Sequence, residues 1–304
     1  MNKSFTLIEI LVVIVVVGVL SAFILVGVDS ITNSANIAKS KAFSSSLKDS
    51  LLTSLVSEWK FEGPTNIDGV ATINDAFDSW GNNNATAISG NPIIKGASDC
   101  VSNKCIDFDS DYITLNQNLF PRSGNWTVEG WFYHKDYTYP RTFAPIGDAN
   151  SYVNGNKGWE IGHAYSSSGV NIVINDGTNR IDSVLSFDNG SKPEQLLNKW
   201  THVVIVFDRL STKKIYGYIN SKKQSSSLDI SLITGDILGN TDIRIGYVVG
   251  WVMYGRIDEV RMYSDIINSD KVKENYYSGL NRLLVKNYFN KKDYSLNVFN
   301  IVNH

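Results

Sequence analysis

The feature that most constrains this chain is an unbroken apolar run near its start, from Phe5 to Val28. As an α-helix this run would extend about 36 Å, long enough to cross the hydrocarbon core of a bilayer. Lys3 lies before the run and Asp29 directly after it, so the positive-inside rule puts the amino terminus in the cytoplasm and the bulk of the chain outside. The only charge within the run is Glu9, and a carboxylate in an apolar helix is costly unless it has a partner. We therefore predict a transmembrane helix over residues 5–28 whose acid has a function.

The residues around this acid resemble the leader of the type IV pilins and pseudopilins. Lys3-Ser4 is followed by Phe5-Thr6-Leu7-Ile8-Glu9 and then by an aliphatic run. The resemblance implies that residues 1–4 are a leader, that a prepilin peptidase cuts between Ser4 and Phe5, and that it methylates the new amino terminus. One departure is Ser4, because the family usually has Gly before the cut.

Two alternatives to a pilin leader are a secretory signal peptide and a simple membrane anchor, and neither explains Glu9. The free amino terminus of a neighbouring subunit would be a suitable partner for this carboxylate if the helices stack with an axial offset. We expect this charge pair to set the register of filament assembly.

Residues 29–58 contain neither Pro nor Gly, and their apolar residues recur at steps of three to five. This spacing is typical of an amphipathic helix whose apolar stripe packs on a neighbour. We therefore predict a helical extension over residues 29–58, which ends before Glu62-Gly63-Pro64.

From residue 59 to about residue 279 the chain is typical of a β-rich domain. Five segments are rich in β-branched and aromatic residues, and Asn-, Gly-, Asp- and Ser-rich stretches separate them, which favours a two-sheet sandwich. The predicted strands are residues 127–134, 200–208, 214–220, 242–248 and 255–263. A net charge of −2 gives no basic field, so no nucleic-acid partner is expected.

Several of these segments resemble the laminin G-like, concanavalin A-like lectin/glucanase family, whose fold is a jelly-roll sandwich. The matching segments follow the family's order: WKFE at 59–62, DSWGNNNATAISG at 78–90, IDFDSDYITL at 106–115, TVEGWF at 127–132, KWTHVVIVFD at 199–208 and GRIDEVRMYSDIINSDKVKENY at 255–276. Ser110 stands where the family usually has Gly. The resemblance implies a mainly β fold over residues 59–279 that serves sugar binding, protein binding or a purely structural role.

Some members of that family hold a calcium ion between the Asn-rich loop and an acid near the last strand. The resemblance points to Asp78, Asn83 and Asp258 as calcium ligands here, with Glu62 a weaker candidate, and calcium prefers such oxygen ligands. The alternative is that Asp78 and the asparagines shape a turn through local hydrogen bonds.

The chain has two cysteines, Cys100 and Cys105, separated by four residues. This spacing suits a small disulfide loop in an oxidising compartment, and two free thiols are the alternative. Half of a metal site is a third reading, but none of the four histidines shows ligand spacing relative to these cysteines.

Near the end of the chain, Asn268-Ser269-Asp270 can cap a helix over residues 271–284, in which Gly279 is a predicted weak point. The remaining tail, residues 280–304, is uninformative.

Catalytic motifs are missing from the sequence. There is no Glu-x-Asp-x-Glu triplet of the glucanases, no Gly-x-Ser-x-Gly elbow, no phosphate loop and no His-Glu-x-x-His motif. Asp258 and Glu259 are adjacent, so on a regular strand they would point to opposite faces. We therefore predict that the protein is not an enzyme.

Exposed aromatic side chains are the usual platform for a sugar ring. Candidates in loop-like surroundings are Tyr137, Tyr139, Tyr152, Tyr165 and Trp251, whereas Trp131, Trp200 and Phe207 are expected to fill the sandwich core.

Together these features predict a pilin-like subunit that is inserted in the cytoplasmic membrane and then extracted into a surface filament or pseudopilus. Its partners would be the prepilin peptidase, membrane lipid, other pilin subunits, and a glycan or matrix protein held by the sandwich. The alternatives are a structural pseudopilin of a secretion or DNA-uptake system without a ligand, and a membrane-anchored glycoside hydrolase.

Overall fold

The computed structural model describes residues 7–8, 11–17, 54–116, 123–138, 141–148, 151, 155–162, 166, 168–188, 193–239 and 241–285. The chain divides into two units, Met1–Thr53 and Ser54–His304. In the first unit, residues 7–8 and 11–17 are helical, whereas Ser4, Phe5 and Glu9 lie outside the described residues, so their roles stay predictions. Within the described residues, no helix is both long and apolar enough to cross a membrane.

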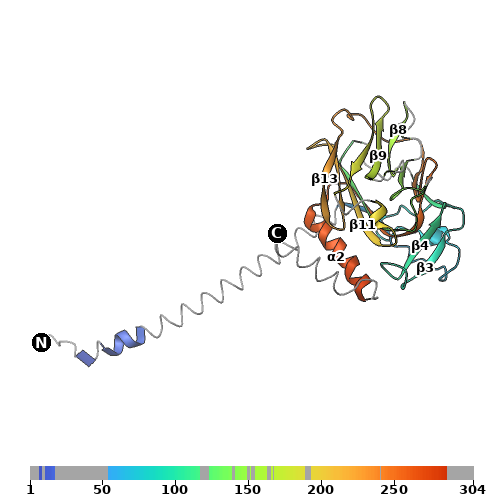
Figure 1. Ribbon diagram of the computed structural model, residues 1–304. Coiled ribbons are helices and arrows are strands. Elements are labelled where there is room, and N and C mark those ends of the chain that lie inside the picture. Colours follow the sequence, from blue (N-terminus) through green and yellow to red (C-terminus); the bar gives the residue numbers. More distant parts are fainter. Residues whose placement is uncertain are drawn as a thin grey trace. The chain divides into compact units, whose positions relative to one another are not determined.

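The described part of the second unit is a β-sandwich with one α-helix (Figure 1). Its helical elements are η1 (Ile73–Asp75), η3 (Pro193–Leu196) and α2 (Ser269–Val285). Its strands are β1 (Leu55–Trp59), β2 (Ala87–Ser89), β3 (Ile93–Gly96), β4 (Lys104–Asp109), β5 (Tyr112–Leu115), β6 (Trp126–His134), β7 (Ile146–Asp148), β8 (Lys157–Ile161), β9 (Gly169–Asp176), β10 (Arg180–Ser186), β11 (Trp200–Asp208), β12 (Lys214–Ile219), β13 (Lys222–Asp229), β14 (Ile243–Ile245), β15 (Tyr247–Val248), β16 (Trp251–Val252) and β17 (Tyr254–Tyr263).

The strands form two antiparallel sheets and a hairpin. The large sheet has the order β13-β12-β11-β6-β17-β4-β3, with β1 paired to β17 outside this path. The small sheet has the order β10-β9-β8-β7-β14-β5-β2, and β15 pairs with β16. One edge of β17 is shared by two strands, because its residues 254–257 pair with β4 and its residues 260–263 pair with β1.

Aromatic side chains from both sheets meet in the core of the sandwich. Trp126 of β6 stacks on Phe207 of β11 with ring centroids 4.1 Å apart, and Trp159 of β8 packs edge-on against Phe207 at 5.8 Å. Such rings each bury a large apolar area, which makes them the main contributors to core stability. The prediction that Phe207 fills the core is confirmed.

The five predicted strands are confirmed, with one division. Residues 127–134, 200–208, 214–220 and 255–263 lie mainly in β6, β11, β12 and β17, whereas 242–248 is divided into β14 and β15 at Gly246, whose φ is +97°. Ser110 has a φ of +69° in the turn between β4 and β5. This left-handed conformation explains why the family that the segment resembles usually has Gly there.

The predicted helical extension over residues 29–58 is wrong at its end, because Leu55–Trp59 is strand β1. Pairing with β17 puts Trp59, which is fully buried, in the sandwich core and turns Glu58 to the opposite face. Tertiary pairing of this kind overrides a local helical periodicity. Residues 29–53 lie outside the described residues, so helix there stays a prediction.

The helix predicted near the end of the chain is confirmed as α2, which lies over β11 in Figure 1. Its first turn is capped by Asn268, whose Oδ1 accepts the backbone N–H of Lys271 at 2.9 Å. Gly279 is not the weak point that we predicted. A Cβ atom at this position would lie 2.4 Å from Cζ2 of Trp131, so the glycine lets the helix approach the indole closely.

Candidate functional site

The face of the large sheet that points away from the sandwich core is covered by α2. One apolar cluster there joins the helix to β6 and β11, and its members are Cys100, Val101, Cys105, Trp131, Trp200, Tyr276, Leu280 and Leu283. Trp131 and Trp200, expected in the sandwich core, therefore lie on the other face of the sheet. Side chains alternate between the two faces along each strand, so Phe132, next to Trp131, and Val203, three residues after Trp200, fill the core instead.

The predicted disulfide between Cys100 and Cys105 is confirmed, with Cα atoms 5.4 Å apart. Both cysteines are fully buried in the cluster beneath α2. The bridge therefore holds the loop before β4 against the helix.

A β-bulge in β17 puts two neighbouring carboxylates on the same face. The register with β6 shifts between Asp258 and Arg261, and Glu259 has a φ of +50°. Ile257 and Val260 pack in the sandwich core, whereas Asp258 and Glu259 both point to the helix-covered face, so our prediction of opposite faces is wrong. Asp258 is 0% exposed and Glu259 3% exposed, which leaves no room for a substrate beside them.

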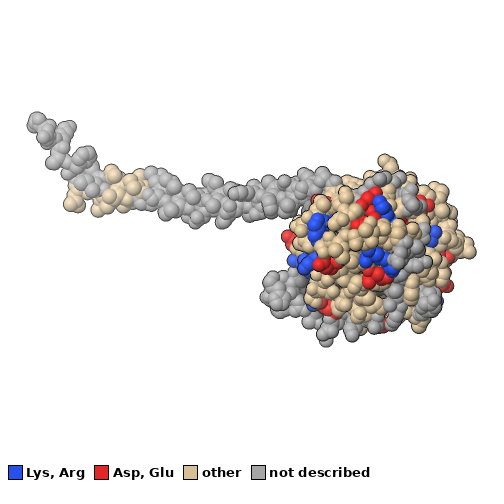
Figure 2. Space-filling view, turned by 90° about the horizontal axis from the view of Figure 1, so that it is seen from above, with Lys and Arg blue, Asp and Glu red and all other residues tan. Residues whose placement is uncertain are grey.

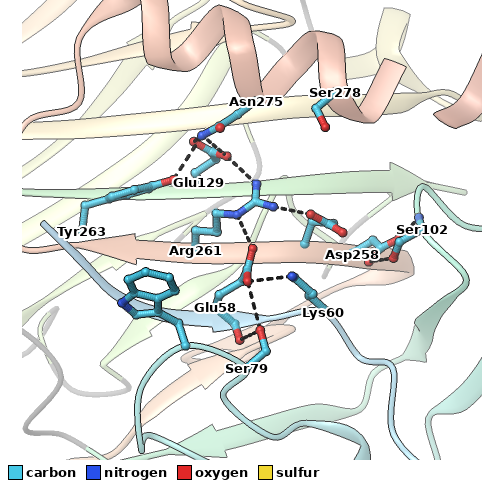
Figure 3. Close-up of polar contacts among 12 residues, drawn as sticks. Glu58, Lys60, Ser79, Ser102, Glu129, Asp258, Arg261, Tyr263, Asn275 and Ser278 are labelled. Atoms are coloured by element: carbon cyan, nitrogen blue, oxygen red, sulfur yellow. Dashed lines mark hydrogen bonds and ion pairs between the residues drawn. The ribbon is translucent and has the colours of Figure 1, made fainter. Parts of the chain in front are cut away.

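Arg261 is the centre of a buried ion network on this face (Figure 3). Its Nε lies 2.7 Å from Glu58 and its Nη1 2.9 Å from Glu129, and its Nη2 pairs with Glu259. Glu58 also pairs with Lys60, at 3.0 Å. Three strands, β1, β6 and β17, are thus joined by one guanidinium.

Helix α2 closes this network from above. Nδ2 of Asn275 donates to both carboxylate oxygens of Glu129, at 3.0 and 2.9 Å, and Arg282 lies 3.2 Å from Glu259. Burial raises the pKa of Glu129, but His202, Arg261 and Asn275 together outweigh burial and lower that pKa to about 2. The helix-covered face is therefore a buried interior rather than an open binding surface.

Asp78, the first of the residues predicted to bind calcium, accepts hydrogen bonds from the backbone around it. Oδ1 of Asp78 accepts the backbone N–H groups of Glu58, Trp80 and Gly81 at 2.9 to 3.0 Å, and its Oδ2 accepts that of Asn83 at 3.0 Å. Burial raises the pKa of Asp78, yet these four donors lower it overall.

The other predicted calcium ligands are engaged elsewhere. Asp258 accepts the backbone N–H of Ser102 at 2.8 Å, and Glu62 accepts that of Asn103 at 2.8 Å. In the described part of the chain, no three acidic, histidine or cysteine side chains are arranged to hold a metal ion. The turn-shaping alternative for Asp78 fits these hydrogen bonds, and calcium binding stays a prediction.

The aromatic candidates for a sugar platform are only partly available. Tyr137 is 4% exposed and packs against His134, with ring centroids 4.9 Å apart, so it is not a platform. Trp251 is half-buried in β16, and Tyr139, Tyr152 and Tyr165 lie outside the described residues.

A different group of half-buried side chains gathers on the outer face of the small sheet. It consists of Tyr112 of β5, Arg244 of β14 and Tyr247 of β15, which we call the tyrosine–arginine cluster. The two phenol rings have centroids 5.1 Å apart, and Cζ of Arg244 lies 4.8 Å from the ring of Tyr112 and 5.2 Å from that of Tyr247. We missed this cluster in the sequence because its residues are far apart along the chain. The available signal was a charge between two strand isoleucines, Ile243 and Ile245.

The cluster lies in a row of small residues. Arg244 is in register with Thr114 on one side and with Gly147 on the other, and Thr114 in turn pairs with the exposed Ala87. The next position in this row is Glu160, which pairs with Gly147, is fully buried and lies against that glycine. Elsewhere on the surface, basic and acidic side chains lie next to one another, as the face in Figure 2 shows.

Solved structures with the same fold are distant in sequence. The binding domain of Paraclostridial Mosquitocidal Protein 1 matches with a TM-score of 0.53 and 20% identity, over 74% of this chain and 52% of that one. Domain 4 of AbnA, a GH43 extracellular arabinanase from Geobacillus stearothermophilus solved in complex with arabinotriose, matches with a TM-score of 0.52 and 17% identity, over 73% and 97%. The botulinum neurotoxin serotype D binding domain gives 0.52 and 15%, over 75% and 52%. The chain spans about half the length of the two toxin domains.

The family comparisons agree with this fold. No curated protein matches the chain. The prokaryotic N-terminal methylation motif, the leader of type IV pilins, matches residues 1–25. The profile of the concanavalin A-like lectin/glucanases superfamily matches residues 107–273, which is more than half of the chain. The chain therefore belongs to the concanavalin A-like lectin/glucanases superfamily, and it carries a pilin-type methylation motif ahead of that domain.

Proposed function

We propose that this protein is a type IV pilin-like subunit of a surface filament whose sandwich binds a carbohydrate and so mediates adhesion. The observation that carries the proposal is the union, in one chain, of a methylation motif at residues 1–25 and a lectin-like sandwich. The motif supports processing by a prepilin peptidase and assembly with other pilins through the N-terminal helix. Glu9 would supply the carboxylate that pairs with a neighbour's amino terminus.

The organisation of the sandwich supports a binding role. One outer face is closed by α2 and its ion network, whereas the other carries half-buried aromatic rings and an arginine. A domain of the same fold was solved with arabinotriose bound, so the fold is compatible with an oligosaccharide ligand. Because the two acids of β17 are buried, Glu259 in ion pairs and Asp258 in hydrogen bonds from Ser102, binding is favoured over catalysis as the role of the domain.

The amino terminus of the mature protein tests the filament part of this proposal. We expect mass spectrometry of the protein from its native cells to find an N-methylated Phe5 as the first residue. A Ser4→Gly variant, which restores the usual residue before the cut, is the matched control and should give the same terminus. An uncut Met1 in the wild-type protein would contradict the proposal.

The binding part is tested with the full-length chain in detergent micelles on a glycan and matrix-protein array. We expect binding to a subset of carbohydrates, without release of shorter sugars during incubation. Binding to no carbohydrate or matrix protein would favour a structural pseudopilin, and steady release of products would favour a hydrolase.

A further inference from the structure

We propose that the tyrosine–arginine cluster is a binding site for sugars that carry a carboxylate, such as uronic or sialic acids. This inference rests on the proposed function, because it names the ligand class and the surface that receives it. Three features support it: Arg244 has no acceptor in the described chain, two tyrosine rings lie beside its guanidinium, and its neighbours in register are small.

Arg244 differs from the other arginines of the described ranges in having no acceptor. Each of the other six donates to a carboxylate or a backbone carbonyl, whereas no ion pair or hydrogen bond within the described chain reaches the Arg244 guanidinium, and its Nε is buried without a partner. The paired arginines and their partners are Arg141 with Asp136, Arg180 with Asp182, Arg209 with the carbonyls of Ile233 and Gly235, Arg256 with Asp99, Arg261 with Glu58, Glu129 and Glu259, and Arg282 with Glu259.

The two tyrosines fix this guanidinium in place. Both rings lie within cation–π distance of it, which is an attractive arrangement that requires no counter-ion. A planar guanidinium held in this way loses little further freedom when it forms two parallel hydrogen bonds to a carboxylate. The cluster is therefore arranged in advance for a planar anion.

In a second cation–aromatic contact, acidic residues of the protein pair with the cations. Arg141 and Lys135 lie 4.2 and 5.2 Å from the ring of Tyr254. Arg141 pairs with Asp136, and Lys135 lies 2.7 Å from Asp107, so the protein itself supplies the anions there. At Arg244 the described chain supplies no anion, so a ligand can provide it.

The residues in register with Arg244 are small. Thr114 and Gly147 flank it, and Glu160, one strand further on, is fully buried against Gly147. Two other acids of the flanking strands accept hydrogen bonds from the protein. Asp111 accepts the backbone N–H groups of Asn91 and Asp109 at 2.9 and 3.0 Å, and Asp148 accepts the hydroxyl of Thr241. Phenol hydroxyls beside a carboxylate-binding arginine can also exchange hydrogen bonds with sugar hydroxyls, which favours an acidic sugar over a simple acidic peptide.

The test titrates the full-length chain in detergent micelles with matched acidic and neutral probes. The probes are trigalacturonate and its methyl ester, 3′-sialyllactose and lactose, a κ-carrageenan tetrasaccharide, which carries sulfates but no carboxylate, and a hexaglutamate peptide. We expect trigalacturonate or sialyllactose to bind, and its neutral counterpart to bind at least tenfold more weakly. Arg244→Gln should weaken the acidic sugar about 10- to 100-fold, the usual range for loss of hydrogen bonds to a charged group. Arg180→Gln, a paired arginine of the same sheet, should leave its binding unchanged.

The outcomes separate this inference from the proposed function. Binding of neutral sugars alone, or acidic-sugar binding that Arg244→Gln leaves intact, overturns the ligand class or the site while the lectin role stands. Equal or tighter binding of the carrageenan fragment or of hexaglutamate overturns the carboxylate-sugar assignment. No binding of any sugar overturns both. If thermal unfolding shows that Arg244→Gln is not folded, Arg244→Lys is used instead. This variant keeps the positive charge but not the planar guanidinium, so it should bind the acidic sugar more weakly and a neutral ligand equally well.

Discussion

Replacing Arg261 with methionine is expected to lower the free energy of unfolding by about 3–5 kcal/mol, because removing one partner of a buried ion pair leaves the other charges uncompensated. Here Glu58, Glu129 and Glu259 would all lose their shared guanidinium. Urea unfolding of the full-length chain in detergent micelles, followed by tryptophan fluorescence, measures the loss. A methionine variant as stable as the wild type at neutral pH would contradict this account of the network.

Two comparisons sharpen that measurement. Arg256→Met is the matched control in the same strand, and it should cost only about 1 kcal/mol because its partner Asp99 has a side chain that is 39% exposed. The pH dependence gives the second comparison. The pKa of Glu129 is lowered from 4.5 to about 2 by folding, so its contribution is present above pH 4.5 and is lost as the pH falls toward 2. The gap between wild type and Arg261→Met should therefore narrow on acidification.

Asp78→Ala is expected to lower the free energy of unfolding by about 2–4 kcal/mol, because four backbone N–H groups lose their acceptor. Asp78→Asn keeps one acceptor oxygen, so its free energy of unfolding should fall by about half as much. The same urea unfolding experiment, repeated with EDTA and with added calcium, should give the wild-type value in both cases. A loss of stability in EDTA as large as that of Asp78→Ala would instead indicate that calcium binds at this turn.

Much of the sandwich could be predicted because its strands are long and their composition is distinctive. The segments that became β6, β11 and β17 combine β-branched and aromatic residues over nine or ten positions, so the local pattern and the tertiary structure agree. Asn268 was also identifiable, because a helix cap is a local feature. The start of the domain was misjudged since β1 is short and depends on pairing with β17.

The face on which a side chain lies was harder to predict than the strand itself. One inserted residue at Glu259 moved Asp258 and Glu259 to the same side, and no local signal marks a bulge with a non-glycine residue at positive φ. Gly279 is a weak point by its helix propensity alone. The indole of Trp131, which leaves no space for a side chain at this position, lies in a strand far away in the sequence. For the same reason Arg244 stayed hidden, since its two tyrosines come from β5 and β15.

The place of β1 in the sheet has a mechanical consequence. Tension that travels along the chain from residue 53 reaches the sandwich first at Leu55–Trp59. This strand is held by a backbone ladder to the second half of β17, by the Glu58–Arg261 pair, and by the turn that Asp78 closes. Pulling it free would have to break all three, so the strand at which force enters is also tied to two other segments of the sandwich.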